Sequence, residues 1–131
     1  MQIRVSGTPT SQGSKRVYNG RIVEAAGQQL KVWRKAIAAA CLAEVKEDHQ
    51  LILGPVRVEV VFHLTRPKTV SESKRPLPIV PPDVDKLLRG LLDGIGQSEV
   101  VWGDDSQVVE VLATKIYNTQ WTGAEITITA I

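Results

Sequence analysis

Apolar and polar residues alternate along several stretches of the chain, and a period of two predicts β-strands. The alternation is cleanest after Gly54-Pro55, where valines at every second position are separated by Arg57, Glu59 and other outward positions. The dipeptide Asn19-Gly20 suits the tight turn of a β-hairpin. The pattern predicts strands at residues 1–5, 56–64, 107–117 and 123–131, and a hairpin at residues 17–23.

The apolar spacing changes to three and four between residues 28 and 45, which predicts a helix. Leu30, Trp33, Ile37 and Cys41 follow this spacing, with alanines between them. Together with a second helix described below, the order strand, hairpin, helix, strand, helix, strand, strand predicts an α+β fold. We expect a single domain over residues 1–131, with one layer of helices on a mixed sheet.

The second helix is expected from about Val84 to Ile95, where leucines and the flanking apolar residues form one stripe. Asp83 follows two prolines and is a natural N-cap. Gly94 and Gly96 are expected to end the helix. The loop before it, residues 66–82, holds five prolines and four basic residues, and a loop of this length is usually functional or mobile.

The composition is that of an ordinary globular protein, with 43% hydrophobic and 23% charged residues in a chain of 131. A single cysteine, Cys41, excludes an internal disulfide and a cysteine-based zinc cluster. We find no apolar run near the length of a membrane span and no signal-peptide pattern at the N-terminus. A cytoplasmic protein with no membrane partner is expected.

Charge is unevenly distributed, although the net charge is only +2. Residues 1–82 carry 13 basic and 6 acidic residues, whereas residues 83–131 carry 3 basic and 8 acidic residues. A basic half could bind a polyanion while an acidic cluster binds cations. The simpler interpretation, two solvated faces of one domain, remains open.

Two acidic pairs lie at element boundaries, Asp83 with Asp85 and Asp104 with Asp105. Carboxylates at such positions can bind Mg²⁺, which needs only one or two of them beside water and phosphate oxygens. They can equally serve the structure as helix caps and turn residues. We expect the helix and the strand that follows it to bring both pairs to the same edge of the domain.

Arg89 lies four residues after Asp85 and four before Asp93, so the three side chains share one side of the predicted helix. They could form a surface ladder of ion pairs, or the arginine could bind phosphate beside the carboxylates. The sequence contains no P-loop, dinucleotide-binding or EF-hand pattern. His49 and His63 are isolated, and His63 is expected to be structural.

The segment from Pro82 to Gly94, with Asp83-Val84-Asp85 at its start, and the segment Gly103-Asp104-Asp105-Ser106-Gln107 together resemble the RusA family of Holliday junction resolvases. The resemblance covers residues 78–118 well, and the N-terminal half agrees in layout. It implies a homodimeric, Mg²⁺-dependent endonuclease, with Mn²⁺ as a substitute, that nicks opposed strands of branched DNA. It also implies a bacterial protein of the cytoplasm or nucleoid, and it is compatible with phage or prophage origin.

Carried over residue by residue, the family's catalytic and metal-binding aspartates fall on Asp83, Asp85 and Asp105, and its catalytic lysine falls on Arg89. Lys86 stands where the family commonly has asparagine. Both departures, at Lys86 and Arg89, keep or add positive charge, although an arginine fork differs in geometry from a lysine. The roles of Asp93 and Asp104 stay open.

Basic residues in the loops are expected to bind the DNA backbone. These residues are Lys15, Arg16, Lys68, Lys74 and Arg75, with Lys86 at the start of the helix. Two alternatives remain: a module that binds junctions without cleaving them, and a small metal-dependent phosphohydrolase acting on nucleotides. The long basic loop favours DNA over nucleotides.

Overall fold

A computed structural model describes residues 1–13, 15–18, 21–24 and 27–131 of the chain, and within 15–18 and 21–24 it describes only the backbone. The elements follow the predicted order, and a short 3₁₀ helix precedes the fifth strand. Their bounds are β1 Gln2–Ser6, β2 Lys15–Tyr18, β3 Arg21–Glu24, α1 Gly27–Glu44, β4 Val56–Leu64, α2 Val84–Gln97, η1 Asp105–Gln107, β5 Val108–Tyr117 and β6 Gly123–Ala130.

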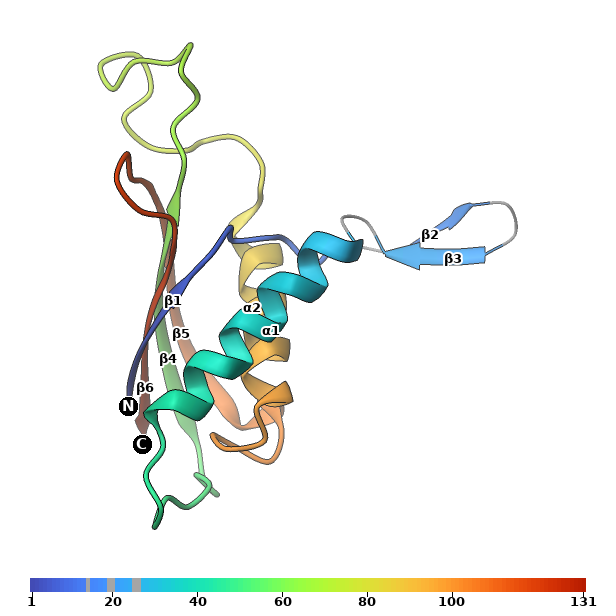
Figure 1. The fold of residues 1–131 in the computed structure, drawn as a ribbon, viewed down its shortest axis with the longest axis vertical. Coiled ribbons are helices and arrows are strands. Elements are labelled where there is room, and N and C mark those ends of the chain that lie inside the picture. Colours follow the sequence, from blue (N-terminus) through green and yellow to red (C-terminus); the bar gives the residue numbers. More distant parts are fainter. Residues whose placement is uncertain (14, 19–20, 25–26) are drawn as a thin grey trace.

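The main sheet has four strands in the order β1-β6-β4-β5, and it is mixed as expected. β4 pairs antiparallel with β6 and parallel with β5, and β1 pairs antiparallel with β6. Figure 1 shows α1 and α2 side by side on one face of this sheet. The predicted α+β fold, with one layer of helices on a mixed sheet, is therefore confirmed.

The predicted hairpin forms a separate two-stranded sheet, in which β2 pairs antiparallel with β3 from Lys15↔Glu24 to Tyr18↔Arg21. The turn expected at Asn19-Gly20 lies outside the described residues. The hairpin prediction is confirmed for the two strands.

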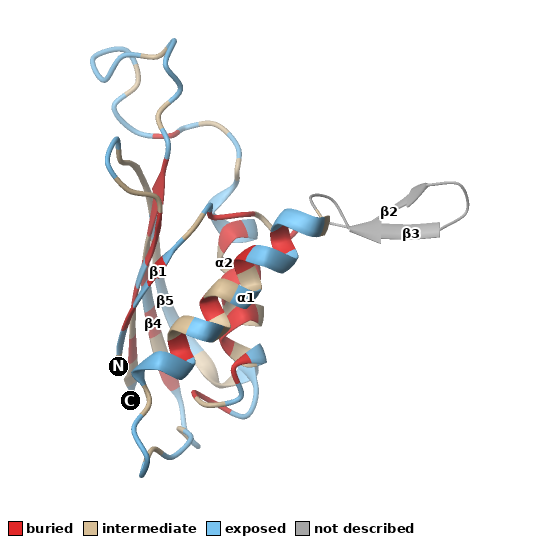
Figure 2. Cartoon of the chain, viewed as in Figure 1, coloured by how far each residue is buried: buried red, intermediate tan, exposed pale blue. Residues whose placement is uncertain are grey.

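The core lies between the sheet and the helices, because alternate residues of β4 and one side of each helix are buried against each other. Val56, Val58, Val60 and Phe62 point toward the helices, and none is more than 2% exposed. Figure 2 shows these buried positions along the surfaces where sheet and helices meet. The apolar residues that recur at helical and strand spacing in the sequence are thus the residues that face each other in one core.

Helix α2 passes through both glycines that were expected to end it and continues to Gln97. Gly94 is needed for packing instead, since a Cβ atom there would lie 3.0 Å from the Cβ of Ile37 on α1. The chain leaves the helix where Glu99 adopts a left-handed φ of 60°. The predicted end of the helix was wrong because close contact between two helices also requires glycine.

The path from β4 to β5 determines where the acidic residues lie. Loop 66–82 leads from the end of β4 to the start of α2, and α2 then runs back along the sheet toward the start of β5 (Figure 1). Asp83 therefore stands before the first turn of α2, whereas Asp104 and Asp105 follow its last turn.

Candidate active site

Asp83 occupies the N-cap position of α2 in an extended conformation, but its side chain makes no capping hydrogen bond. The expected capping role is therefore wrong for the side chain. Its carboxylate is about half exposed, and Lys86 Nζ lies 3.6 Å from Asp83 Oδ2. The Asp83 carboxylate is therefore not used as a cap and remains accessible to solvent.

Asp85 and Arg89 are exposed on the first two turns of α2, and neither has a hydrogen-bond or ion-pair partner among the described residues. The ladder Asp85, Arg89, Asp93 does not form in this part of the chain. Asp93 instead accepts a 2.7 Å hydrogen bond from Gln12 Nε2. Gln12 is buried and also donates its backbone N–H to the carbonyl of Lys86, so Asp93 anchors the N-terminal loop on α2.

Asp104 caps η1 in a reciprocal arrangement with Gln107. The Asp104 carboxylate accepts a 2.9 Å hydrogen bond from the backbone N–H of Ser106. Hydrogen bonding with Ser106, through its side chain first and then its backbone, lowers the pKa of Asp104. Gln107 Oε1 accepts from the Asp104 N–H, and its Nε2 donates to the carbonyls of Ile52 and Gly54. Asp104 is therefore occupied by the fold. The Asp-x-x-Gln spacing is the sequence signal for this capping box.

Asp105 differs from its neighbour, since its carboxylate is exposed and has no partner among the described residues. It lines a pocket of 360 Å³ at the end of α2, together with Asp93, Asp104 and the buried Trp102. Val101 and Trp102 belong to the core. One acidic pair thus contains one structural carboxylate and one that is available for a ligand.

The two acidic groups do not meet within one chain, which corrects the expectation that helix and strand bring them to one edge. Asp85 and Asp93 are eight residues apart on α2, or about 12 Å along its axis at about 1.5 Å per residue. Lys115 binds the segment before Asp83 from the far half of β5, whereas Asp105 lies just before that strand begins. Among the described residues, no three His, Cys, Asp or Glu side chains are grouped so that they could hold a metal ion.

In the basic loop 66–82, one residue organises the fold and others face the solvent. Arg66 donates to the backbone carbonyls of Ser71, Arg75 and Pro76, and its guanidinium lies 4.3 Å from the centroid of the Tyr117 ring. Lys68 and Lys74 are exposed, and Arg75 is partly buried. Lys15 and Arg16 lie on β2, whose side chains are outside the described part of the structure.

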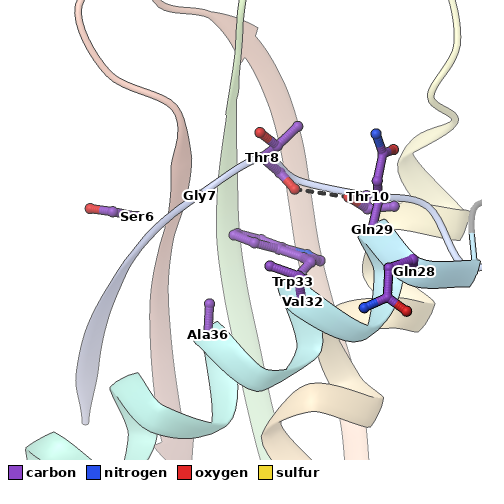
Figure 3. A pocket seen from close by; sticks show the side chains of 9 residues that line it. All are labelled: Ser6, Gly7, Thr8, Thr10, Gln28, Gln29, Val32, Trp33 and Ala36. Atoms are coloured by element: carbon purple, nitrogen blue, oxygen red, sulfur yellow. Dashed lines mark hydrogen bonds between the residues drawn. The ribbon is translucent and has the colours of Figure 1, made fainter.

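Another pocket, of 280 Å³, lies between the segment after β1 and the start of α1. Figure 3 shows Trp33, Val32 and Ala36 on its helix side, with Thr8 and Thr10 opposite. Its nine lining residues carry no titratable side chain, so this pocket offers no acid, base or carboxylate ligand. The acidic ends of α2 remain the stronger candidate for chemistry.

Two further groups are accounted for by the fold. Burial raises the pKa of the Cys41 thiol to about 11, despite an opposing hydrogen bond with Ser98, so the thiol is a poor nucleophile. His63 lies 2.6 Å from Glu125 Oε1 through its Nε2 and 3.2 Å from the Asn118 amide through its Nδ1. These contacts give His63 a structural explanation on the sheet face opposite the helices.

The chain matches one protein family over nearly its whole length. Residues 6–129 match the family model described as Endodeoxyribonuclease RusA, which is nearly the whole chain. The chain therefore belongs to the RusA endodeoxyribonuclease family, a family of nucleases that act on DNA. It is also 29% identical over 129 residues to a Bacillus subtilis (strain 168) protein called "Uncharacterized protein YqaN", with 90% of this chain and 88% of the relative covered.

In the part of the chain that the structure describes, no helix is both long and apolar enough to cross a bilayer.

Proposed function

We propose that the protein is a metal-dependent endonuclease that resolves four-way DNA junctions by nicking two opposed strands. The observation that carries this proposal is the family match over residues 6–129. It is combined with three exposed carboxylates that accept no hydrogen bond from the described residues. These belong to Asp83, Asp85 and Asp105. Carboxylate oxygens are the ligands that Mg²⁺ prefers, so the donor set fits the metal that the resemblance implies.

Asp83 and Asp85 would hold Mg²⁺, or Mn²⁺ in its place, at the start of α2. The bound ion would supply a water of lowered pKa and would offset charge at the scissile phosphate. Arg89 lies one turn after Asp85 on the exposed side of the helix, where its fork can bind two phosphate oxygens. Lys86 can contribute a second positive charge at the same end.

A homodimer could bring Asp105 of one copy close to the Asp83 and Asp85 carboxylates of the other, although the three are separated within one chain. β5 is an edge strand, and its Val109, Val111 and Leu112 are 64%, 39% and 62% exposed. Long apolar edge strands tend to be covered by another chain. If two copies of β5 paired antiparallel about a two-fold axis, Asp105 of one copy would approach Asp83 and Asp85 of the other. Two equivalent sites would suit two opposed strands of a junction.

The basic loops would bind the DNA backbone around these sites. Lys68, Lys74 and Arg75 lie on loop 66–82, which ends next to Asp83, and Lys15 and Arg16 lie on β2. Phosphate contacts of this kind position DNA without reading its sequence, and they weaken as salt concentration rises. We therefore expect junction binding to fall steeply with salt.

The proposal is tested with labelled four-way junctions and matched linear duplex, in Mg²⁺ or EDTA. We expect paired nicks in the junction alone, with cleavage lost in EDTA and in Asp83→Asn or Asp105→Asn. Asp48→Asn is a matched control, since Asp48 is an exposed aspartate in the segment after α1. Tight junction binding without nicking in either metal would indicate a binding module, and turnover of mononucleotides with weak DNA binding would indicate a phosphohydrolase.

The shared site has its own test. An equimolar mixture of Asp83→Asn and Asp105→Asn chains forms mixed dimers in which one of two shared sites has both wild-type carboxylates. We expect single nicks to return in the mixture, although each variant alone is inactive. If each site were built within one chain, every site in the mixture would carry one substitution and no activity would return.

A further inference from the structure

Lys115 is a charged residue on the side of the sheet that faces the core. It pairs with the fully buried Phe62 across β4 and β5. Ala113, two residues earlier and therefore on the same face of β5, packs against the hydrophobic core. Lysine is rarely placed on such a face without a partner that compensates its charge.

The partners of Lys115 are backbone carbonyls immediately before Asp83. Lys115 Nζ donates hydrogen bonds of 2.8 Å to the carbonyl oxygens of both Val80 and Pro82. Pro81 and Pro82 have no N–H group, so neither proline can donate a backbone hydrogen bond that would hold it in place. Among the described residues, no carboxylate pairs with Lys115, and the ammonium group is committed to these two carbonyls.

These contacts place Asp83 relative to the sheet. Pro82 directly precedes Asp83, whose own side chain does not fix the start of α2 by capping. The first hydrogen bond of the helix, from the Leu87 N–H to the Asp83 carbonyl at 3.0 Å, begins at the same residue. The ammonium group therefore joins β5 to the point where the carboxylates of Asp83 and Asp85 are presented.

We propose that Lys115 is a positioning residue that holds the Asp83–Asp85 segment in place for metal binding by bonding the two carbonyls before it. The role in cleavage rests on the proposed nuclease function, whereas the bond itself can be tested without metal or DNA. Among the described residues, the ammonium group of Lys115 forms hydrogen bonds with main-chain atoms alone, so in this proposal it acts through Asp83 and Asp85 and not on the substrate.

The first test is hydrogen exchange of the metal-free protein. Lys115→Met keeps the length of the side chain and removes the donors, and Lys115→Arg keeps donors. Arg57→Met is the matched control, because Arg57 is a basic residue on the neighbouring strand that faces the other side of the sheet and pairs with Glu110. We expect Lys115→Met to speed exchange over the first two turns of α2 by about tenfold or more, while exchange in α1 stays within twofold. Lys115→Arg should restore most of the protection.

The second test is junction cleavage in a single turnover as a function of Mg²⁺ concentration. We expect Lys115→Met to raise the half-saturating Mg²⁺ concentration at least fivefold, with junction binding in EDTA within twofold of wild type, and Lys115→Arg to recover most of the loss. Unchanged exchange at the start of α2, or equal acceleration throughout the protein, would overturn the proposal. If the wild-type protein cleaves no DNA, the nuclease function fails, and the exchange result still decides whether Lys115 holds the segment.

Discussion

The two ends of helix α2 are both acidic, yet the fold uses them differently. At the N-terminal end, the carboxylates of Asp83 and Asp85 form no hydrogen bond with the described residues, and Lys115 donates hydrogen bonds to the segment before them. At the C-terminal end, Asp104 caps η1 and Asp93 accepts a hydrogen bond from Gln12. Of the two aspartates that follow the helix, Asp105 resembles Asp83 and Asp85 in having a side chain without such a task among the described residues, whereas Asp104 does not.

This difference shows why acidic residues in a motif cannot be treated alike. A carboxylate that completes a cap contributes to folding and is already surrounded by its donors, whereas an exposed carboxylate without donors keeps its oxygens for a ligand. The comparison therefore separates the aspartates of this chain into those expected to affect stability and those expected to affect cleavage. Substitutions at the two ends of α2 test this division.

The largest expected effect is on cleavage at the N-terminal end. Asp85→Asn should lower the single-turnover rate of junction cleavage on the order of 10³-fold, or about 4 kcal/mol of transition-state stabilisation. Asp93→Asn should leave the rate within about threefold, because an asparagine can still accept the bond from Gln12. Quenched-flow cleavage of labelled junctions measures both variants. Equal losses at the two positions would show that the division between the ends is wrong.

The next effect concerns the cation at the same end. Arg89→Ala should lower the cleavage rate about 100-fold, since removing one group that stabilises developing charge typically costs 10²–10³. Arg89→Lys should retain at least a tenth of the activity, because a point charge keeps the attraction and loses the fork. The same assay is run at saturating junction, with Lys35→Ala on the exposed side of α1 as control. If Lys35→Ala lost as much activity as Arg89→Ala, the effect of Arg89 would be explained by non-specific electrostatic attraction for DNA.

Packing at the C-terminal half of α2 should affect stability instead. Gly94→Ala would press against Ile37, so we expect a loss of unfolding free energy of about 1–2 kcal/mol after the helix-propensity gain of about 1 kcal/mol is included. Gly96→Ala is the matched control, since the nearest atom to its added Cβ is 3.8 Å away. Urea unfolding measures both. If Gly94→Ala proved as stable as Gly96→Ala, the close contact between the helices would not limit residue size there.

The smallest effect is the pH dependence of stability from Asp104. Hydrogen bonding with Ser106, through its side chain first and then its backbone, lowers the pKa of Asp104 in the folded protein below the ordinary value of 3.8. The ionised carboxylate therefore adds stability above that ordinary value, and the contribution is lost as pH falls through the lowered pKa. We expect the difference in Tm between wild type and Asp104→Ala to be largest near neutral pH and to shrink below about pH 4. A difference that stays constant with pH would mean that Asp104 does not stabilise η1 through its charge.

The hydrophobic pattern was sufficient to predict the helices and strands of the main fold, their order and the residues of the core. Periods of two and of three to four are set by backbone geometry, so Val56 to Leu64 could be recognised as a strand and the Leu30 to Cys41 spacing as a helix without any knowledge of their neighbours. The motifs around Asp83 and Asp105 also suggested the family, and the match over residues 6–129 confirmed it. Both the secondary structure and the family could be predicted because each depends on residues that lie close together in the sequence.

The structural roles of several residues depend on tertiary contacts that the sequence does not show. Gly94 looked like the end of a helix, yet it lies inside α2 because α1 approaches it closely. Asp104 and Asp105 are adjacent aspartates, and the structure shows that Asp104 accepts a capping hydrogen bond while Asp105 has no partner among the described residues. Lys115 gave no signal except its place on an inward position of a strand, and its partners lie more than thirty residues earlier. Distances between residues far apart in the chain depend on packing, and for this reason the separation of Asp83 from Asp105 could not be read from their spacing.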